Sequence, residues 1–186
     1  MTLYLKYRPQ TIDEIDINSV RVTLTNILKS GNIPHAFLFA GPRGTGKTSL
    51  ARILAKAINC ESINPPAGGP PCNKCDSCIS ITNGNNIDVI EMDAASNRGI
   101  DDIRVLRDAV KLSPANSKAK IYIIDECHML TNDASNALLK TLEEPPAHVY
   151  FILATTNPEK LIETIKSRTT IISFSKATKE EIKRYC

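Results

Sequence analysis

Short apolar runs alternate with longer amphipathic stretches along most of the 186-residue chain. Four of the runs are almost continuously apolar, which is typical of parallel strands that are covered on both faces. The runs that we predict to be strands are 36–40, 87–92, 121–125, 149–154 and 170–174. The pattern therefore predicts an α/β fold with a doubly wound, parallel, five-stranded sheet.

The stretches between these runs have helical spacing and recognisable ends. Gly31 would end the first helix, Pro145 and Pro146 would stop the fourth, and Asn157 would cap the fifth. The predicted helices are 19–30, 47–59, 100–110, 131–143 and 158–167. Ligands of doubly wound sheets bind at the carboxyl ends of the strands, so we expect functional residues directly after the strands.

The first predicted strand is followed by GPRGTGKTS, which contains the phosphate-binding pattern G-x-x-x-x-G-K-[ST]. Glycines let backbone N–H groups turn around the phosphates, and the next helix adds the positive end of its dipole. Lys47 would contact the β- and γ-phosphates, and Thr48 would bind Mg²⁺. The alternative is a glycine turn that only joins a strand to a helix. The predicted loop comprises Gly41, Pro42, Arg43, Gly44, Thr45, Gly46, Lys47 and Thr48.

The run IYIIDECH places two acidic residues at the end of an apolar strand. Asp125 would hold Mg²⁺ through its water shell, and Glu126 would orient or deprotonate the attacking water. An aspartate at a strand end is also a common helix cap, but its pairing with a phosphate loop favours a nucleotide site. The letters DECH also occur in superfamily-two helicases, which we exclude because 186 residues leave no room for their two lobes.

The fourth strand ends in ILATTN, beside Asp125 if the two strands are neighbours. A hydroxyl at this point could detect the γ-phosphate, and we predict this role for Thr156. The alternative is helix capping, which we expect of Asn157.

Four cysteines lie in the stretch CESINPPAGGPPCNKCDSC, which we interpret as part of an insertion at about 60–86. Cys60, Cys72, Cys75 and Cys78 have the spacing C-x₁₁-C-x₂-C-x₂-C, and four thiolates can complete a tetrahedral Zn²⁺ site. Such a site has no open position, so it would be structural. The alternative is four unrelated buried cysteines. Cys127 is expected to pack beside the strand end at Asp125 and Glu126.

Composition is that of an ordinary globular protein, with 42% hydrophobic and 23% charged residues. No apolar segment is long enough to span a membrane, and the N-terminus has no secretion-signal pattern. We therefore expect a cytoplasmic location and no membrane partner. Thiols in a reducing compartment favour metal binding over disulfides. The net charge of +3 is too small to indicate nucleic-acid binding by itself.

The chain resembles the AAA+ clamp-loader ATPases of replicative DNA polymerases over nearly its whole length. The matching stretches, in the family's order, are YRPQT, HAFLFAGPRGTGKTSLARILAKAINC with the four cysteines, EMDAAS, IYIIDECHML, NALLKTLEEPP, ILATTNPEKL and the Ser-Arg of IKSRTTIISF. The resemblance implies an ATPase that uses ATP, Mg²⁺ and a structural Zn²⁺. It also implies a hetero-oligomer with other clamp-loader subunits, which places the sliding clamp on primer–template DNA without sequence preference.

The same resemblance gives roles to single residues. Thr156 takes the sensor-1 position, and Arg168 takes the arginine of the Ser-Arg-Cys motif, which acts in trans on the ATP of a neighbouring subunit. Thr169 stands where the family has Cys. Without the resemblance, Arg168 would be a surface arginine at a helix C-terminus.

The segment Tyr7, Arg8 and Pro9 is similar to the part of the family that lies against the adenine; the alternative is an exposed tail. Residues Asp16–Asn18 stand where the family usually has Val-Gly-Gln.

Contact with DNA phosphates is implied for Arg98, at the start of the third predicted helix. Arg104, Arg107 and Lys111 share one face of that helix, and we interpret this face as a solvated one.

We predict an AAA+ ATPase domain at 1–177 and the start of a helical lid domain at 178–186, where Thr178 and Glu181 form a capping box. The sequence is interpreted as the ATPase core of a larger protein. The alternative function is a zinc-dependent scaffold whose nucleotide site does not hydrolyse ATP. Intact Lys47, Thr48 and Glu126 argue against it.

Overall fold

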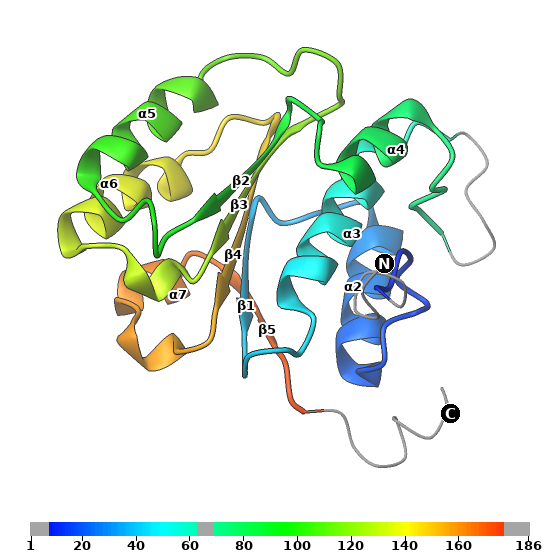
Figure 1. The fold of residues 1–186 in the computed structure, drawn as a ribbon, viewed down its shortest axis with the longest axis horizontal. Coiled ribbons are helices and arrows are strands. Elements are labelled where there is room, and N and C mark those ends of the chain that lie inside the picture. Colours follow the sequence, from blue (N-terminus) through cyan, green and yellow to red (C-terminus); the bar gives the residue numbers. More distant parts are fainter. Residues whose placement is uncertain (1–7, 63–68, 177–186) are drawn as a thin grey trace.

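The computed structural model describes residues 8–62 and 69–176. Within them, five strands form one parallel sheet in the order β2-β3-β4-β1-β5 (Figure 1). The strands are β1 Ala36–Ala40, β2 Val89–Asp93, β3 Lys120–Asp125, β4 Val149–Thr155 and β5 Thr170–Ser173. The predicted doubly wound, five-stranded α/β fold is confirmed, and β3 and β4 are neighbours as the candidate site requires.

Helices cover both faces of the sheet. The helices α2, α3 and α4 lie on one face, and α5, α6 and α7 lie on the other (Figure 1). Their bounds are α2 Asn18–Ser30, α3 Lys47–Asn59, α4 Asp76–Asn83, α5 Ile100–Val110, α6 Asn132–Glu143 and α7 Glu163–Lys166, with short 3₁₀ turns η1 Cys127–Met129 and η2 Pro158–Lys160. The fold is therefore a three-layer sandwich whose sheet is in the middle.

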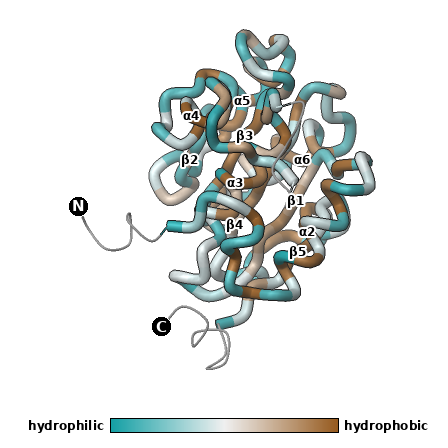
Figure 2. Tube along the Cα trace, turned by 90° about the vertical axis from the view of Figure 1, so that its right-hand side faces the viewer, coloured by the Kyte–Doolittle hydropathy of each residue, from teal (hydrophilic) through white to brown (hydrophobic). Residues whose placement is uncertain are grey.

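Each face of the sheet has its own hydrophobic core. Phe37 and Phe39 of β1 pack with residues of α2 and α3, while Leu38 between them packs with residues of α5 and α6. This alternation follows from the two-residue period of a strand. The hydrophobic segments accordingly gather along the strands and the inner sides of the helices (Figure 2). Burial on both faces explains why β1, β3 and β4 are nearly continuous apolar runs.

Two expectations about the region after β4 are wrong. Residues 158–167 do not form one helix, because Leu161 and Ile162 are extended and separate η2 from α7. The extended backbone lets Leu161 reach the core with Ile165. Asn157 does not cap a helix with its side chain; its backbone N–H instead donates to Thr155 Oγ1 (3.1 Å).

Helix α4 was not among the predicted helices. Its sequence DSCISITN has few apolar residues, and the buried ones, Cys78 and Ile81, give only a weak helical pattern. Gly84 ends the helix with a left-handed φ of 72°. The insertion at about 60–86 thus contains a helix, which packs on α3.

The predicted lid start at 178–186 lies outside the described residues, and the boundary at 177 stays a prediction. In the part of the chain that the structure describes, no helix has both the length and the apolar character that crossing a bilayer requires.

Candidate nucleotide site and cysteine cluster

A cavity of 1220 Å³ opens at the carboxyl ends of β1, β3 and β4. The structure brings together here most residues that the sequence indicated for nucleotide binding. They are Arg8, Pro9, Arg43, Gly44, Thr45, Gly46, Lys47, Thr48, Asp125, Glu126 and Thr156. Tyr7 lies outside the described residues. The cavity is at the position where doubly wound sheets bind ligands.

The loop between β1 and α3 depends on its glycines. A Cβ on Gly41 would lie 2.3 Å from the carbonyl oxygen of Phe174, whose N–H donates to Ala40 O (2.7 Å). Gly44 and Gly46 have left-handed φ angles of 81° and 87°, which side chains disfavour. The loop can therefore turn tightly around a phosphate at the N-terminus of α3.

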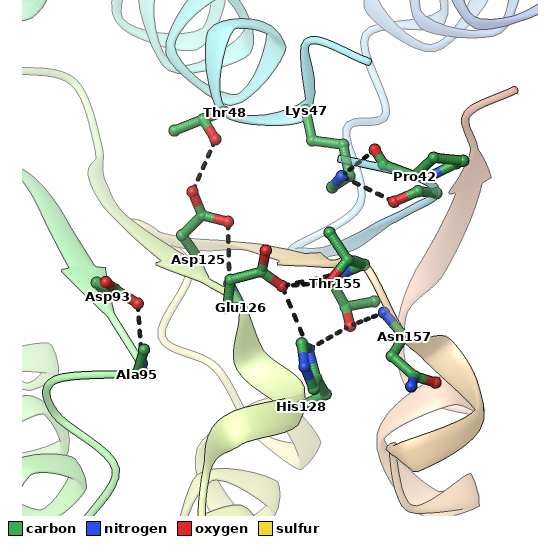
Figure 3. Close-up of polar contacts among 12 residues, drawn as sticks. Pro42, Lys47, Thr48, Asp93, Ala95, Asp125, Glu126, His128, Thr155 and Asn157 are labelled. Atoms are coloured by element: carbon green, nitrogen blue, oxygen red, sulfur yellow. Dashed lines mark hydrogen bonds and ion pairs between the residues drawn. The ribbon is translucent and has the colours of Figure 1, made fainter. Parts of the chain in front are cut away.

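Lys47 is the first residue of α3 and is almost fully buried, with 6% of its surface exposed. Its ammonium donates to the carbonyl oxygens of Gly41 and Pro42, both at 2.8 Å (Figure 3). Burial lowers the pKa of Lys47, and the nearby charges of Glu126 and Asp125 act in the opposite direction. The structure thus places a cation inside the loop, as phosphate binding requires.

Thr48 and Asp125 line the cavity and contact each other directly. Thr48 Oγ1 donates to Asp125 Oδ2 (2.7 Å), and Asp125 Oδ1 accepts the N–H of Glu126 (2.9 Å). Both side chains offer the oxygen ligands that Mg²⁺ prefers. Asp93 pairs in register with Asp125 and also lines the cavity, although the sequence reading passed over it.

Glu126 has an unusual backbone conformation. Its φ of 48° and ψ of 42° lie in the left-handed region, which costs a side-chain-bearing residue about 1 kcal/mol. Its carboxylate Oε2 accepts from Thr156 Oγ1 (2.8 Å) and from the Thr156 N–H (3.2 Å). Thr156 therefore holds Glu126, and these contacts fix the direction of the carboxylate into the cavity.

His128 is a site residue that sequence reasoning missed. Its Nδ1 lies 3.0 Å from Thr155 Oγ1 and 3.3 Å from Glu126 Oε2 (Figure 3). The turn η1 places the His128 ring beside the Glu126 carboxylate. In the sequence, the indication of a site residue was that this histidine comes two residues after Glu126. Cys127 is buried, as expected, and burial raises its pKa to about 12.

The other side of the cavity is formed by the N-terminal segment. Arg8 and Pro9 line it together with Ile15, Asp16 and Ile17. Arg8 Nε donates to Ser49 Oγ of α3 (2.9 Å), so this segment contacts the helix that carries Lys47. We refer to Arg8 and Pro9 as the base-side wall, after the sequence prediction that this segment lies against the adenine.

The four predicted cysteines form one cluster. Their sulfur atoms all lie within 4.8 Å of one another, and the Sγ atoms of Cys72 and Cys78 are 4.0 Å apart. Tetrahedral Zn²⁺ with Zn–S bonds of about 2.3 Å needs sulfurs about 3.8 Å apart. The arrangement therefore fits a zinc ion after a small contraction.

Hydrogen bonds to sulfur support the same interpretation. The N–H groups of Lys74 and Cys75 both donate to Cys72 Sγ (3.4 Å). Led by the bond from Lys74, they lower the pKa of Cys72 to about 6, whereas burial raises the pKa of Cys78. N–H donors stabilise thiolates, which are the form that binds metals. The cluster is compatible with zinc.

Arg168 lies at the opposite end of the sheet from the cavity. It comes two residues before β5, and a small hollow beside it is lined by Pro34, His35 and Ala36 at the start of β1. Its Nη2 pairs with Glu143 Oε1 (2.7 Å), and Nη1 donates to Thr164 O (3.1 Å). Because the strands are parallel, Arg168 is separated from the cavity of its own chain by the length of β1.

Arg98 is exposed and precedes Gly99, the N-cap of α5. The first turn of α5 also contains Asp101 and Asp102, and Asp102 accepts the N–H of Gly99 (3.1 Å). On the same helix, Arg104 pairs with Asp101 and Lys111 with Asp108, which agrees with a solvated face.

Residues 18–178 match the family described as DNA polymerase III, delta subunit. The chain is 52% identical to DNA polymerase III subunit tau of Bacillus subtilis, over 97% of this chain and 32% of that protein. It is also 52% identical to subunit tau of Escherichia coli, over 88% of this chain and 25% of that protein. The chain thus spans about a third or less of the length of these curated relatives.

Solved structures share the fold of this chain. A DNA polymerase III gamma-subunit-related protein from Thermotoga maritima is 28% identical, with a TM-score of 0.60 over 86% of this chain and 46% of that one. A single-substitution variant of RuvB from Thermotoga maritima, 21% identical, shares the AAA+ fold with a TM-score of 0.64 over 96% of this chain and 52% of its own. The chain belongs to the DNA polymerase III delta-subunit family, and within it is about half identical to bacterial gamma and tau subunits over most of its length.

Proposed function

We propose that this chain is the ATPase core of a clamp-loader subunit, which binds and hydrolyses ATP in a multi-subunit assembly that places a sliding clamp on primed DNA. The observation that carries the proposal is the convergence of Lys47, Thr48, Asp125 and Glu126 on one cavity, in a chain whose relatives are DNA polymerase III subunits. We place the protein with the replication machinery in the cytoplasm.

The contacts suggest how each residue acts. Loop residues 41–48 would cradle the phosphates, and Lys47 would exchange its carbonyl partners for phosphate oxygens. Thr48 and Asp125 would hold Mg²⁺, which neutralises phosphate charge when bound. Glu126 would orient the attacking water. Thr156 would release the Glu126 carboxylate when the Thr156 hydroxyl turns to the γ-phosphate. The base-side wall would lie against the adenine.

Arg168 would act on the ATP of a neighbouring subunit. Arg168 lies too far from the cavity of its own chain to contact a nucleotide there. Its guanidinium could exchange the exposed carboxylate of Glu143 for a phosphate of the neighbour's nucleotide. A guanidinium that reaches a transferring phosphate stabilises the charge of the transition state.

The proposal is tested by the rate of phosphate release from the chain assembled with its partner subunits. We expect the rate to rise when sliding clamp and primed DNA are both present. A rate that is independent of both would contradict a clamp-loading ATPase.

Zinc binding gives a direct prediction. Protein purified without chelator should contain about one zinc ion per chain, and Cys72→Ser should lose it, because a hydroxyl is a poor substitute for a thiolate ligand. The measurement is metal content by plasma mass spectrometry. Cys127→Ser is the matched control, since Cys127 lies outside the cluster, and it should keep its zinc. Wild-type protein without zinc would contradict the assignment.

DNA contact is proposed for Arg98. We expect Arg98→Glu to weaken DNA-stimulated ATP hydrolysis of the assembled loader equally on different sequences, because phosphates have no sequence information. The salt dependence of DNA binding should also fall by about one unit of slope. Arg104→Glu, on the solvated face of α5, serves as the control. Unchanged stimulation across salt concentrations would exclude Arg98 from the contact.

A further inference from the structure

Lys56 connects three segments that are far apart in the sequence. It lies on α3 and is only 2% exposed, although it is a lysine. Its ammonium donates to Gln10 O (3.1 Å), Gln10 Oε1 (2.8 Å) and Asn73 Oδ1 (2.7 Å). An ammonium has three protons to donate, and here each has an acceptor. The contacts join α3 to the N-terminal segment and to the loop of the cysteine cluster.

The position of Asn73 is set by the cysteine cluster. Asn73 follows Cys72 and has a left-handed φ of 57°, a conformation that asparagine tolerates better than most residues. The next two N–H groups, of Lys74 and Cys75, both point at Cys72 Sγ. A sulfur held by a metal would therefore fix the turn that presents the Asn73 amide. That amide also donates from Nδ2 to Gln10 O (3.2 Å).

Gln10 continues the connection to the cavity. Its Nε2 donates to Arg8 O (3.3 Å), and Arg8 donates in turn to Ser49 on α3. Arg8 and Pro9 form the base-side wall. Direct contacts therefore run from the cluster through Asn73 and Gln10 to the wall of the cavity.

The polar contacts around Lys56 are interdependent. A buried cation is costly unless its donors are all satisfied, so the acceptors must keep their places. The position of Gln10 thus depends on Asn73 as well as on Lys56. A zinc ion with four thiolates would add net negative charge beside this ammonium, which favours the same arrangement.

We propose that Asn73 is a positioning residue through which the metal-bound cysteine cluster holds the base-side wall, so that the cluster raises affinity for the base part of the nucleotide. The inference rests on the proposed ATP binding in this cavity. It gives the cluster a role in ligand binding beyond stabilising its own loop.

The test compares two ligands in the zinc-loaded chain. ATP would contact both the loop and the base-side wall, whereas inorganic tripolyphosphate would contact the loop alone. We expect Asn73→Gly, which suits the left-handed backbone, to weaken ATP binding about fivefold or more, the range of coupling between two sites. Tripolyphosphate binding should not change. Calorimetric titration gives both dissociation constants.

Controls separate this coupling from simple damage. Asn83→Ala, at an exposed position on the same insertion, should bind both ligands like wild type. Asn73→Asp keeps an oxygen for Lys56 and should recover most of the ATP affinity. Removal of zinc with a chelator should reproduce the selective loss in wild type and add little in Asn73→Gly.

Several results would overturn the inference. An equal loss for ATP and tripolyphosphate would show that Asn73→Gly disturbs α3 and the phosphate loop instead. Unchanged ATP affinity, or an Asn73→Asp variant as weak as Asn73→Gly, would also exclude the positioning role. Wild-type protein that binds neither ligand would contradict the proposed nucleotide site itself, and the inference with it.

Discussion

Glu126→Gln should lower ATP hydrolysis by the assembled complex about a thousandfold, within the range that a positioned general base contributes. The amide cannot take the proton of the attacking water, but it can still accept hydrogen bonds from Thr156. ATP affinity should therefore stay close to that of wild type. The measurements are phosphate release with clamp and primed DNA, and equilibrium binding of a fluorescent ATP analogue.

The matched control is Glu159→Gln on η2, where the glutamate is exposed and does not line the cavity. It should hydrolyse ATP at the wild-type rate. A Glu126→Gln complex that retains more than a tenth of the wild-type rate would exclude Glu126 as the base. Hydrolysis would then depend on another residue or on another subunit of the complex.

Arg168→Ala should reduce hydrolysis by the assembled complex by about a thousandfold or more, the effect of removing an arginine supplied in trans. The variant loses the guanidinium that stabilises charge on the neighbour's transferring phosphate. ATP binding by the isolated chain should not change, because Arg168 lies at the far end of the sheet from its own cavity. The measurements are the rate of ATP hydrolysis by the assembled complex and the ATP affinity of the isolated chain.

Mixed assemblies make this test specific. Arg168→Ala chains can still offer an intact cavity to a wild-type neighbour, so partial activity should return when they are mixed with wild type. Arg104→Ala, which removes an exposed arginine from α5, is the control and should have no effect. A normal rate for an assembly made only with Arg168→Ala chains would contradict the role in trans.

Features that depend on short stretches of sequence were predictable. The predicted phosphate loop is one contiguous segment whose glycines, Lys47 and Thr48 are recognised by their spacing alone, and Asp125 follows an apolar run that is typical of a buried strand. The break in the predicted helix at 158–167 was not predictable, because burial of Leu161 in the core outweighs local helical preference.

Features that depend on distant segments could not be predicted. Lys56 looks like an ordinary polar residue of a helix, yet it is buried and donates hydrogen bonds to Gln10 and Asn73. The contacts of His128 with Thr155 and Glu126 depend on the 3₁₀ turn η1 and on the neighbouring strand β4. The left-handed backbone of Glu126 also has no local signature, since it is maintained by contacts with Asp125 and Thr156.

Strand β5 has a consequence for communication between subunits of the proposed assembly. Arg168 stands just before this strand, and Phe174, directly after it, presses its backbone against Gly41 of the phosphate loop. An extended strand of four residues cannot shorten appreciably, since each residue spans about 3.3 Å. A neighbour's nucleotide that pulls on Arg168 would therefore move the rim of this chain's own phosphate loop. Successive ATP sites would respond to one another through a single short strand.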